Sequence, residues 1–185
     1  PPGSASKIRR VPKLSVTVIT RDEAANLAAA LDSVAWADEI VVVDSESTDA
    51  TVDIARRYTR KVLVRPWPGY VAQKNRAAAE ATHDWILSLD ADERVSPALA
   101  AEIQGLLKGE PAAPGYRVPR VTFHLGRWIR STDWYPDYQL RLYDRRRARW
   151  TGKLVHESVQ ADGTVVDLAG DLQHYAYRNL SHHLQ

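Results

Sequence analysis

Residues 84–93 read Asp-Trp-Ile-Leu-Ser-Leu-Asp-Ala-Asp-Glu. The mostly apolar stretch from Trp85 to Leu89 is typical of a buried strand, and it ends directly in the carboxylates of Asp90, Asp92 and Glu93. In open α/β sheets, ligands bind beyond the carboxyl ends of the parallel strands. This stretch therefore predicts a strand that delivers acidic side chains to a binding site.

The segments around it alternate between strand-like and helical patterns. Further apolar, β-branched stretches that are typical of strands occupy residues 14–20, 39–44 and 61–65. Helical spacing or helix-start signals follow the four strands at residues 22–34, 47–58, 70–81 and 96–109. This alternation predicts a Rossmann-like, mostly parallel α/β sheet with helices on both of its faces.

The C-terminal part of the chain changes character. Its strand-like stretches have no long helices between them and occupy residues 116–125, 138–143, 154–159, 165–169 and 173–177. We expect one domain over residues 14–185, in which residues 14–110 form the parallel half and residues 111–185 add a smaller mixed or antiparallel part. Residues 1–13 are basic and contain proline, which predicts a flexible arm.

The composition excludes several classes of protein. With 185 residues, 44% of them apolar and 26% charged, the chain is typical of a globular domain. It has no cysteine, which excludes disulfides, zinc–thiolate sites and thiol catalysis. No stretch approaches the ~20 consecutive apolar residues that a transmembrane helix needs. Neither the dinucleotide-binding glycine pattern nor a P-loop is present.

Charge is distributed unevenly along the chain. Nine acids lie within the first 53 residues, whereas residues 116–160 carry ten Lys or Arg against four acids. The run Arg145–Arg149 is either a solvated turn or, together with Trp128, Trp134 and Trp150, a surface for an anionic glycan, a glycolipid or a membrane. No nucleic-acid-binding motif accompanies it, so we expect no nucleic acid partner.

Acidic side chains recur at the ends of the predicted strands. Asp22 follows the first strand, Asp44 closes the second, and Asp90 and Asp92 follow the fourth. Carboxylates gathered at one sheet edge repel each other unless a cation lies between them, and oxygen ligands favour Mg²⁺ or Mn²⁺ carrying a phosphate. The alternative is a set of polar turns, which are also rich in Asp.

Four motifs follow one another in the order and spacing of a known family: Thr20–Leu27 (TRDEAANL), Ala37–Asp49 (ADEIVVVDSESTD), Gln73–Asn75 (QKN) and Trp85–Glu93 (WILSLDADE). As an ordered set they resemble the family-2 inverting glycosyltransferases of the GT-A fold, in particular the bacterial lipopolysaccharide-core β-glucosyltransferase branch. The stretches Trp134–Leu142 (WYPDYQLRL) and Val155–Glu157 (VHE) also look like that branch. The resemblance covers roughly residues 14–180.

The resemblance implies roles for polar residues of the nucleotide-sugar half. It implies donor contacts from Thr20, Asp22, Glu23, Asp44, Lys74, Asp90 and Arg141. Asp44 matches the family's contact to the nucleobase or ribose, and Asp92 matches its ligand for Mg²⁺ or Mn²⁺. The alternatives are that Asp44 caps the next loop, that Asp22 serves a helix N-terminus, and that Lys74 is a solvated helix lysine.

On the acceptor side, Asp137 matches the general base that takes the proton of the attacking hydroxyl. The alternative for Asp137 is an ion pair with Arg141, which either binds the diphosphate or holds Asp137 in place. Acceptor or metal contacts are expected from Trp134, Gln139 and His156. For His156 and for His174, a satisfied core histidine is the alternative.

Together these features predict metal-dependent, inverting transfer of a hexose from a UDP-sugar to a saccharide acceptor such as lipopolysaccharide core. One alternative is a nucleotidyltransferase acting on a sugar phosphate, but the Gly-rich loop typical of such enzymes is missing after the first strand. The other is a non-catalytic module that binds a nucleotide sugar or an anionic glycan. The expected location is the cytoplasm, with peripheral contact to the inner face of the bacterial cytoplasmic membrane. Related enzymes continue beyond the segment at residues 179–185, so we expect a catalytic-core fragment or a short relative.

Overall fold

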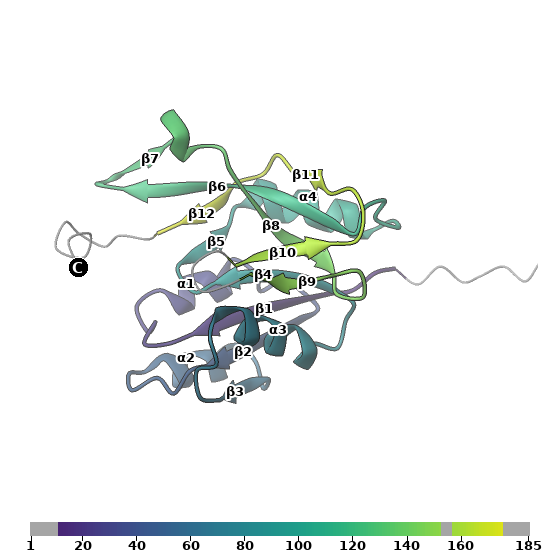
Figure 1. Cartoon of the computed structure of the whole chain (residues 1–185). Coiled ribbons are helices and arrows are strands. Elements are labelled where there is room, and N and C mark those ends of the chain that lie inside the picture. Colours follow the sequence, from purple (N-terminus) through teal and green to yellow (C-terminus); the bar gives the residue numbers. More distant parts are fainter. Residues whose placement is uncertain (1–10, 153–156, 176–185) are drawn as a thin grey trace, which may run out of the picture.

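The computed structural model describes residues 11–152 and 157–175 (Figure 1). Strands β1 (Leu14–Thr20), β2 (Glu39–Asp44), β3 (Val62–Val64) and β4 (Trp85–Asp90) form the parallel half of the sheet, in the order β3-β2-β1-β4. Their apolar and β-branched residues fill both faces of this half, as buried parallel strands require.

The register of these strands brings their carboxyl ends level. Thr20, the last residue of β1, lies opposite Asp44 of β2. Ile19 of the same strand lies opposite Asp90, the last residue of β4. The sheet edge that the sequence predicts as acidic is therefore formed.

The second half extends the sheet past β4 with mostly antiparallel pairing. The sheet continues through β8 (Asp137–Asp144), β6 (Gly115–His124), β12 (Leu172–His174) and β5 (Glu93–Val95). Strands β7 (Arg127–Ile129) and β11 (Val166–Asp167) also pair with β6. In Figure 1 this half, coloured green to yellow, lies at the opposite end of the molecule from β2 and β3. A separate pair is formed by β9 (Ala148–Thr151) and β10 (Ser158–Ala161).

Three helices, α1 (Leu27–Asp32), α2 (Thr51–Tyr58) and α3 (Tyr70–Glu80), cover the two faces of the parallel half. The fourth, α4 (Pro97–Leu107), lies beside β6 and β11 (Figure 1), and a 3₁₀ turn, η1, spans Thr132–Trp134. Val16 and Val18 of β1 face a core shared with α1, α2 and α4. Val41 and Val43 of β2 face a second core against α3 and the β9–β10 pair. No helix within the described ranges is long and apolar enough to cross a membrane.

Several element boundaries differ from the sequence-based expectation. The first helix begins at Leu27 rather than at Asp22, because Asp22 adopts a left-handed backbone with φ 52° that no α-helix tolerates. The second helix begins at Thr51. Ser47 does not cap this helix, because its hydroxyl binds Asp44. Strands β5, β7 and β9 were not anticipated, since each has only three or four residues. Residues 154–156 of the strand expected at 154–159 lie outside the described residues, and its end, Ser158 and Val159, belongs to β10.

Candidate functional site

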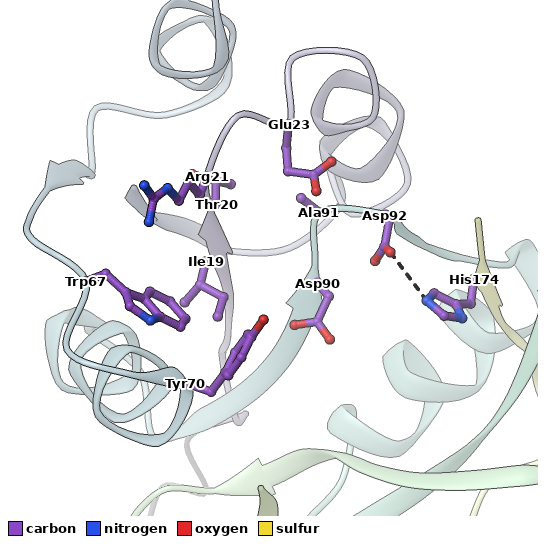
Figure 2. Close-up of a pocket in the computed structure, with 10 residues that line it drawn as sticks. All are labelled: Ile19, Thr20, Arg21, Glu23, Trp67, Tyr70, Asp90, Ala91, Asp92 and His174. Atoms are coloured by element: carbon purple, nitrogen blue, oxygen red, sulfur yellow. Dashed lines mark ion pairs between the residues drawn. The ribbon is translucent and has the colours of Figure 1, made fainter. Parts of the chain in front are cut away.

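A cavity of about 430 Å³ opens at the carboxyl ends of β1 and β4 (Figure 2). Its size is within the range of ordinary ligand pockets. The walls consist of Ile19, Thr20, Arg21, Glu23, Trp67, Tyr70, Asp90, Ala91, Asp92 and His174. Four of the residues predicted to bind the donor or the metal therefore lie in one pocket: Thr20, Glu23, Asp90 and Asp92.

Asp92 and His174 meet at one side of this pocket. The distance from His174 Nε2 to Asp92 Oδ2 is 3.3 Å, and Figure 2 shows the two side chains pointing toward each other. His174 Nδ1 lies 3.4 Å from Thr122 Oγ1. That hydroxyl can hold the ring through Nδ1 while Nε2 faces the pocket. The sequence left His174 undecided, because only the pairing of β12 with β5 brings it beside the acids.

Asp90 is held by two cations. Lys74 Nζ lies 3.1 Å from Asp90 Oδ1, and Arg141 Nη2 lies 2.8 Å from Asp90 Oδ2. Burial raises the pKa of Asp90, but the charges of Arg141 and Lys74 outweigh it and lower that pKa well below its usual range. Lys74 is buried, with its ammonium 4.2 Å from the ring centre of Trp150. It is therefore not the solvated helix lysine of the alternative.

Glu93 lies behind Asp90 and has no exposed side-chain surface. Its Oε2 accepts a hydrogen bond of 3.0 Å from the Asp90 backbone N–H, and its Oε1 accepts one of 2.7 Å from Arg141 Nη2. Burial raises the pKa of Glu93, and the charge of Arg141 opposes that rise. The sequence marked Glu93 only as the end of the acidic run. Its burial depends on the pairing of β5 with β12, a strand distant in the chain.

Asp137 has different partners from those expected. Arg120 donates to Asp137 Oδ2 from Nε at 2.9 Å and from Nη2 at 2.6 Å, and Gln139 donates to Oδ1 at 2.7 Å. Arg141 instead binds Asp90 and Glu93, so the alternative in which Asp137 forms an ion pair with Arg141 is wrong, whereas the general-base role of Asp137 stays a prediction. The cause is strand pairing, since β6 places Arg120 directly opposite Asp137.

Asp137 does not line the pocket itself. Its partner Arg120 has Nη1 3.7 Å from Glu93 Oε1, and Glu93 in turn accepts a hydrogen bond from the backbone N–H of Asp90, which does line the pocket. The side chain of Asp137 is 35% exposed to solvent. It is therefore fixed in orientation and still open to solvent.

The acids at the ends of β1 and β2 bind neighbouring groups of the two strand ends and of the loop after β2. Asp44 is fully buried; its Oδ2 accepts from Thr20 Oγ1 at 2.8 Å, and its Oδ1 accepts from the Ser47 N–H at 2.8 Å. Asp22 Oδ1 accepts from the Thr48 N–H at 2.7 Å. Both carboxylates thus organise the 44–51 loop, and a direct nucleotide contact by either one stays a prediction.

Trp134 and the basic run Arg145–Arg149 do not line the pocket. Trp134 is half-exposed in η1, with its ring 5.7 Å from that of His124, and His156 lies outside the described residues. Arg145 donates to the carbonyls of Ala78 and Ala81. In the same run, Arg146 pairs with Asp144, and Arg147 donates to the carbonyl of Asp162. Much of the basic run is therefore committed to intramolecular contacts.

The arrangement offers few ready-made metal ligands. Within the described residues, no three His, Asp or Glu side chains are grouped as a complete metal site. Asp92 and His174 supply one oxygen and one nitrogen, which is typical of a site that shares its cation with a phosphate-bearing ligand. The chemistry that fits is binding of a diphosphate through a divalent ion.

The sequence matches known proteins over most of its length. Residues 15–161 match the profile of "Glycosyl transferase family 2". A lipopolysaccharide core biosynthesis glycosyltransferase, LpsC of Rhizobium meliloti, is 32% identical over 174 residues, which are 89% of this chain and 64% of LpsC. An uncharacterized glycosyltransferase of Rickettsia felis is 52% identical over 93 residues, which are 50% of this chain and 33% of that protein.

Solved structures share the fold. S. aureus TarS in complex with UDP-GlcNAc superposes with a TM-score of 0.52 at 25% identity, covering 63% of this chain and 36% of TarS. Glucosyl-3-phosphoglycerate synthase from Mycobacterium tuberculosis, in complex with Mn²⁺ and UDP-glucose, gives a TM-score of 0.50 at 23% identity, covering 59% of this chain and 44% of that one. The mostly parallel α/β sheet expected from the sequence is confirmed as the GT-A type.

Proposed function

This chain belongs to glycosyltransferase family 2, and we propose that it catalyses metal-dependent, inverting transfer of a hexose from a UDP-sugar to a saccharide acceptor. The observation that carries the proposal is the pocket in which Asp92 and His174 lie beside Asp90 at the end of β4. UDP as the nucleotide is supported by the UDP-sugar complexes of the two structural neighbours. Lipopolysaccharide core as the acceptor is supported by the similarity to LpsC.

Asp92 and His174 are the proposed ligands of the Mg²⁺ or Mn²⁺ ion. Asp92 suits this task because its partner is a histidine, whereas Asp90 already binds Lys74 and Arg141. When bound, the ion neutralises the charge that develops on the departing diphosphate. The role of Asp90 is to keep Lys74 and Arg141 at fixed positions beneath that diphosphate.

Asp137 is the proposed general base. Arg120 and Gln139 fix the plane of its carboxylate, and Oδ1, with one donor, keeps a free lone pair for an acceptor hydroxyl. In the transfer, the acceptor oxygen bonds to the anomeric carbon as the bond to the diphosphate breaks. The hydroxyl proton passes to Asp137, and the sugar configuration inverts because attack occurs opposite to the leaving group.

The test measures UDP release from a panel of UDP-sugars with Mn²⁺, with and without a lipopolysaccharide-core acceptor. Asp92→Asn and His174→Gln should raise the Mn²⁺ concentration needed for half-maximal rate. Asp137→Asn should lower kcat by about 10²- to 10⁴-fold while the Kd for UDP stays unchanged. Asp53→Asn, which alters an acid that is 79% exposed, is the matched control. Wild-type turnover in both Asp92→Asn and Asp137→Asn would refute the assignment.

A further inference from the structure

Two aromatic side chains form the side of the pocket that faces away from Asp92 and His174. Trp67 is 39% exposed and Tyr70 is 48% exposed, which is high for rings of this size in a monomer. Their ring centres are 4.7 Å apart at an interplanar angle of 86°. Figure 2 shows both rings bordering the cavity across from the Asp92–His174 pair.

The backbone holds these rings in place before any ligand binds. Pro66 and Pro68 flank Trp67, and proline fixes the φ angle of each position. Gly69 has a φ of +100°, and the next residue, Tyr70, is the first residue of α3. Rings that are already oriented lose little conformational freedom when a ligand stacks on them.

The sheet order determines which part of a nucleotide sugar lies near these rings. In such a donor, the diphosphate separates the nucleobase from the hexose. The rings follow β3 at one edge of the sheet, Asp92 follows β4 at its middle, and Asp137 belongs to β8 beyond it. If Asp92 holds the diphosphate and Asp137 activates the acceptor, then the hexose lies toward β8 and the nucleobase toward β3.

Asp44, at the end of the neighbouring strand β2, exposes little surface on which a nucleobase could rest. The carboxylate of Asp44 is fully buried, and its oxygens already accept hydrogen bonds from Thr20 and Ser47. A flat nucleobase gains most from stacking on an aromatic ring, because every base has a π-face.

We propose that Trp67 and Tyr70 form the binding platform for the pyrimidine base of the donor nucleotide. This inference rests on the proposed function, because it takes the position of the diphosphate from the Asp92–His174 pair.

The experiment measures binding by calorimetry in the presence of Mn²⁺, with UDP, uridine and pyrophosphate as three separate probes. Trp67→Ala and Tyr70→Ala should each raise the Kd for UDP by about 5- to 150-fold, as expected for loss of one stacked base. Affinity for pyrophosphate should stay at the wild-type value. Trp67→Phe and Tyr70→Phe keep an aromatic face and should retain most of the UDP affinity.

Two further measurements make the outcome specific. Val64, just before the loop that carries Trp67, has an exposed apolar side chain that is not part of the pocket wall. Val64→Ala should therefore leave the Kd for UDP unchanged. UDP should also quench the fluorescence of Trp67, and this quenching should be missing in Trp67→Phe.

The possible results separate the two proposals. If the wild-type chain turns over a UDP-sugar while both alanine variants bind UDP as tightly as the wild type does, the platform is overturned and the proposed function stands. An increase only in the KM for the acceptor would also overturn it, since the rings would then contact the acceptor. Failure of the wild-type chain to release UDP from any donor would overturn the proposed function itself.

Discussion

The buried ion pair between Glu93 and Arg141 allows a quantitative prediction. Glu93 is 0% exposed, Arg141 is 3% exposed, and their closest atoms are 2.7 Å apart. Glu93→Ala removes this partner and the acceptor for the Asp90 N–H. Nε and Nη1 of Arg141 already have no hydrogen-bond partner among the described residues. Removal of one member of a buried pair costs about 3–5 kcal/mol, and we expect a loss of unfolding free energy in that range.

The chain contains a matched control for this change. Arg117 and Asp167 form an equally short pair, with Arg117 Nε 2.6 Å from Asp167 Oδ1, but their side chains are 44% and 38% exposed to solvent. Water and salt screen such a pair, and double-mutant cycles on similar pairs give small energies. Asp167→Ala should therefore leave the free energy of unfolding nearly unchanged. The two pairs are alike in chemical groups and distance, and they differ in burial and in the hydrogen bond that Glu93 also accepts from the Asp90 N–H.

The assay is urea unfolding at pH 7, followed by circular dichroism and extrapolated to water with the m-value checked for each variant. Glu93→Gln keeps an oxygen acceptor for the Asp90 N–H and for Arg141, so its cost should be about 1–3 kcal/mol, between the other two. The reasoning is refuted if Glu93→Ala loses less unfolding free energy than Asp167→Ala does. It is also refuted if all three variants unfold at the same urea concentration as the wild type.

Two further predictions concern stability. Burial raises the pKa of Glu39, but hydrogen bonds from Lys61 and neighbouring hydroxyls outweigh it and lower that pKa to about 2. The stabilisation that Glu39 gives the fold is therefore complete above pH ~4.3, the pKa of Glu in an unfolded chain, and is lost as the pH falls toward 2. In urea titrations, Glu39→Gln should lower the free energy of unfolding by about 1–2 kcal/mol at pH 7, a value discounted because Lys61 is partly exposed. Near pH 2 the same substitution should cost nothing. An equal cost at both pH values would contradict this prediction. Gly170→Ala would place its methyl group against the backbone of Leu99 and should lower Tm, whereas Gly105→Ala, which meets nothing within 4 Å, should raise it; equal melting temperatures would contradict both.

The sequence predicted the parallel half and its acidic edge because both depend on local patterns. Strand ends in a parallel sheet lie level with one another, so an acid that closes a buried strand can be assigned to the ligand edge from sequence alone. Asp90 and Asp92 were located in this way. The family match and the GT-A neighbours confirm the class of fold and the glycosyltransferase family.

The partners of these acids could not be predicted, because they come from strands distant in the chain. His174 reaches Asp92 only through the pairing of β12 with β5. Arg120 reaches Asp137 only because β6 and β8 are antiparallel in one particular register. Alternation along a strand indicates which side chains share a face, but not which strand lies beside it.

Local competition for hydrogen bonds limits prediction in a second way. Asp44 was correctly expected at the end of β2, but its oxygens bind Thr20 at the end of β1 and Ser47 of the following loop. An Asp near a turn can satisfy nearby backbone N–H and hydroxyl groups as readily as it can bind a ligand. Its sequence position alone does not distinguish these two uses.

The distribution of Lys and Arg among the acids of this sheet edge is the reason why we propose Asp92, and not Asp90 or Glu93, as the metal ligand. Asp90 contacts Lys74 and Arg141, and Glu93 contacts Arg141. An added divalent ion would have to compete with those fixed positive charges, and it would be repelled by them at close range. Among the described residues, Asp92 contacts His174 and no Lys or Arg, and a neutral imidazole is itself a metal ligand. The same strand end thus provides two acids that fix basic side chains and one acid that remains available for the cation.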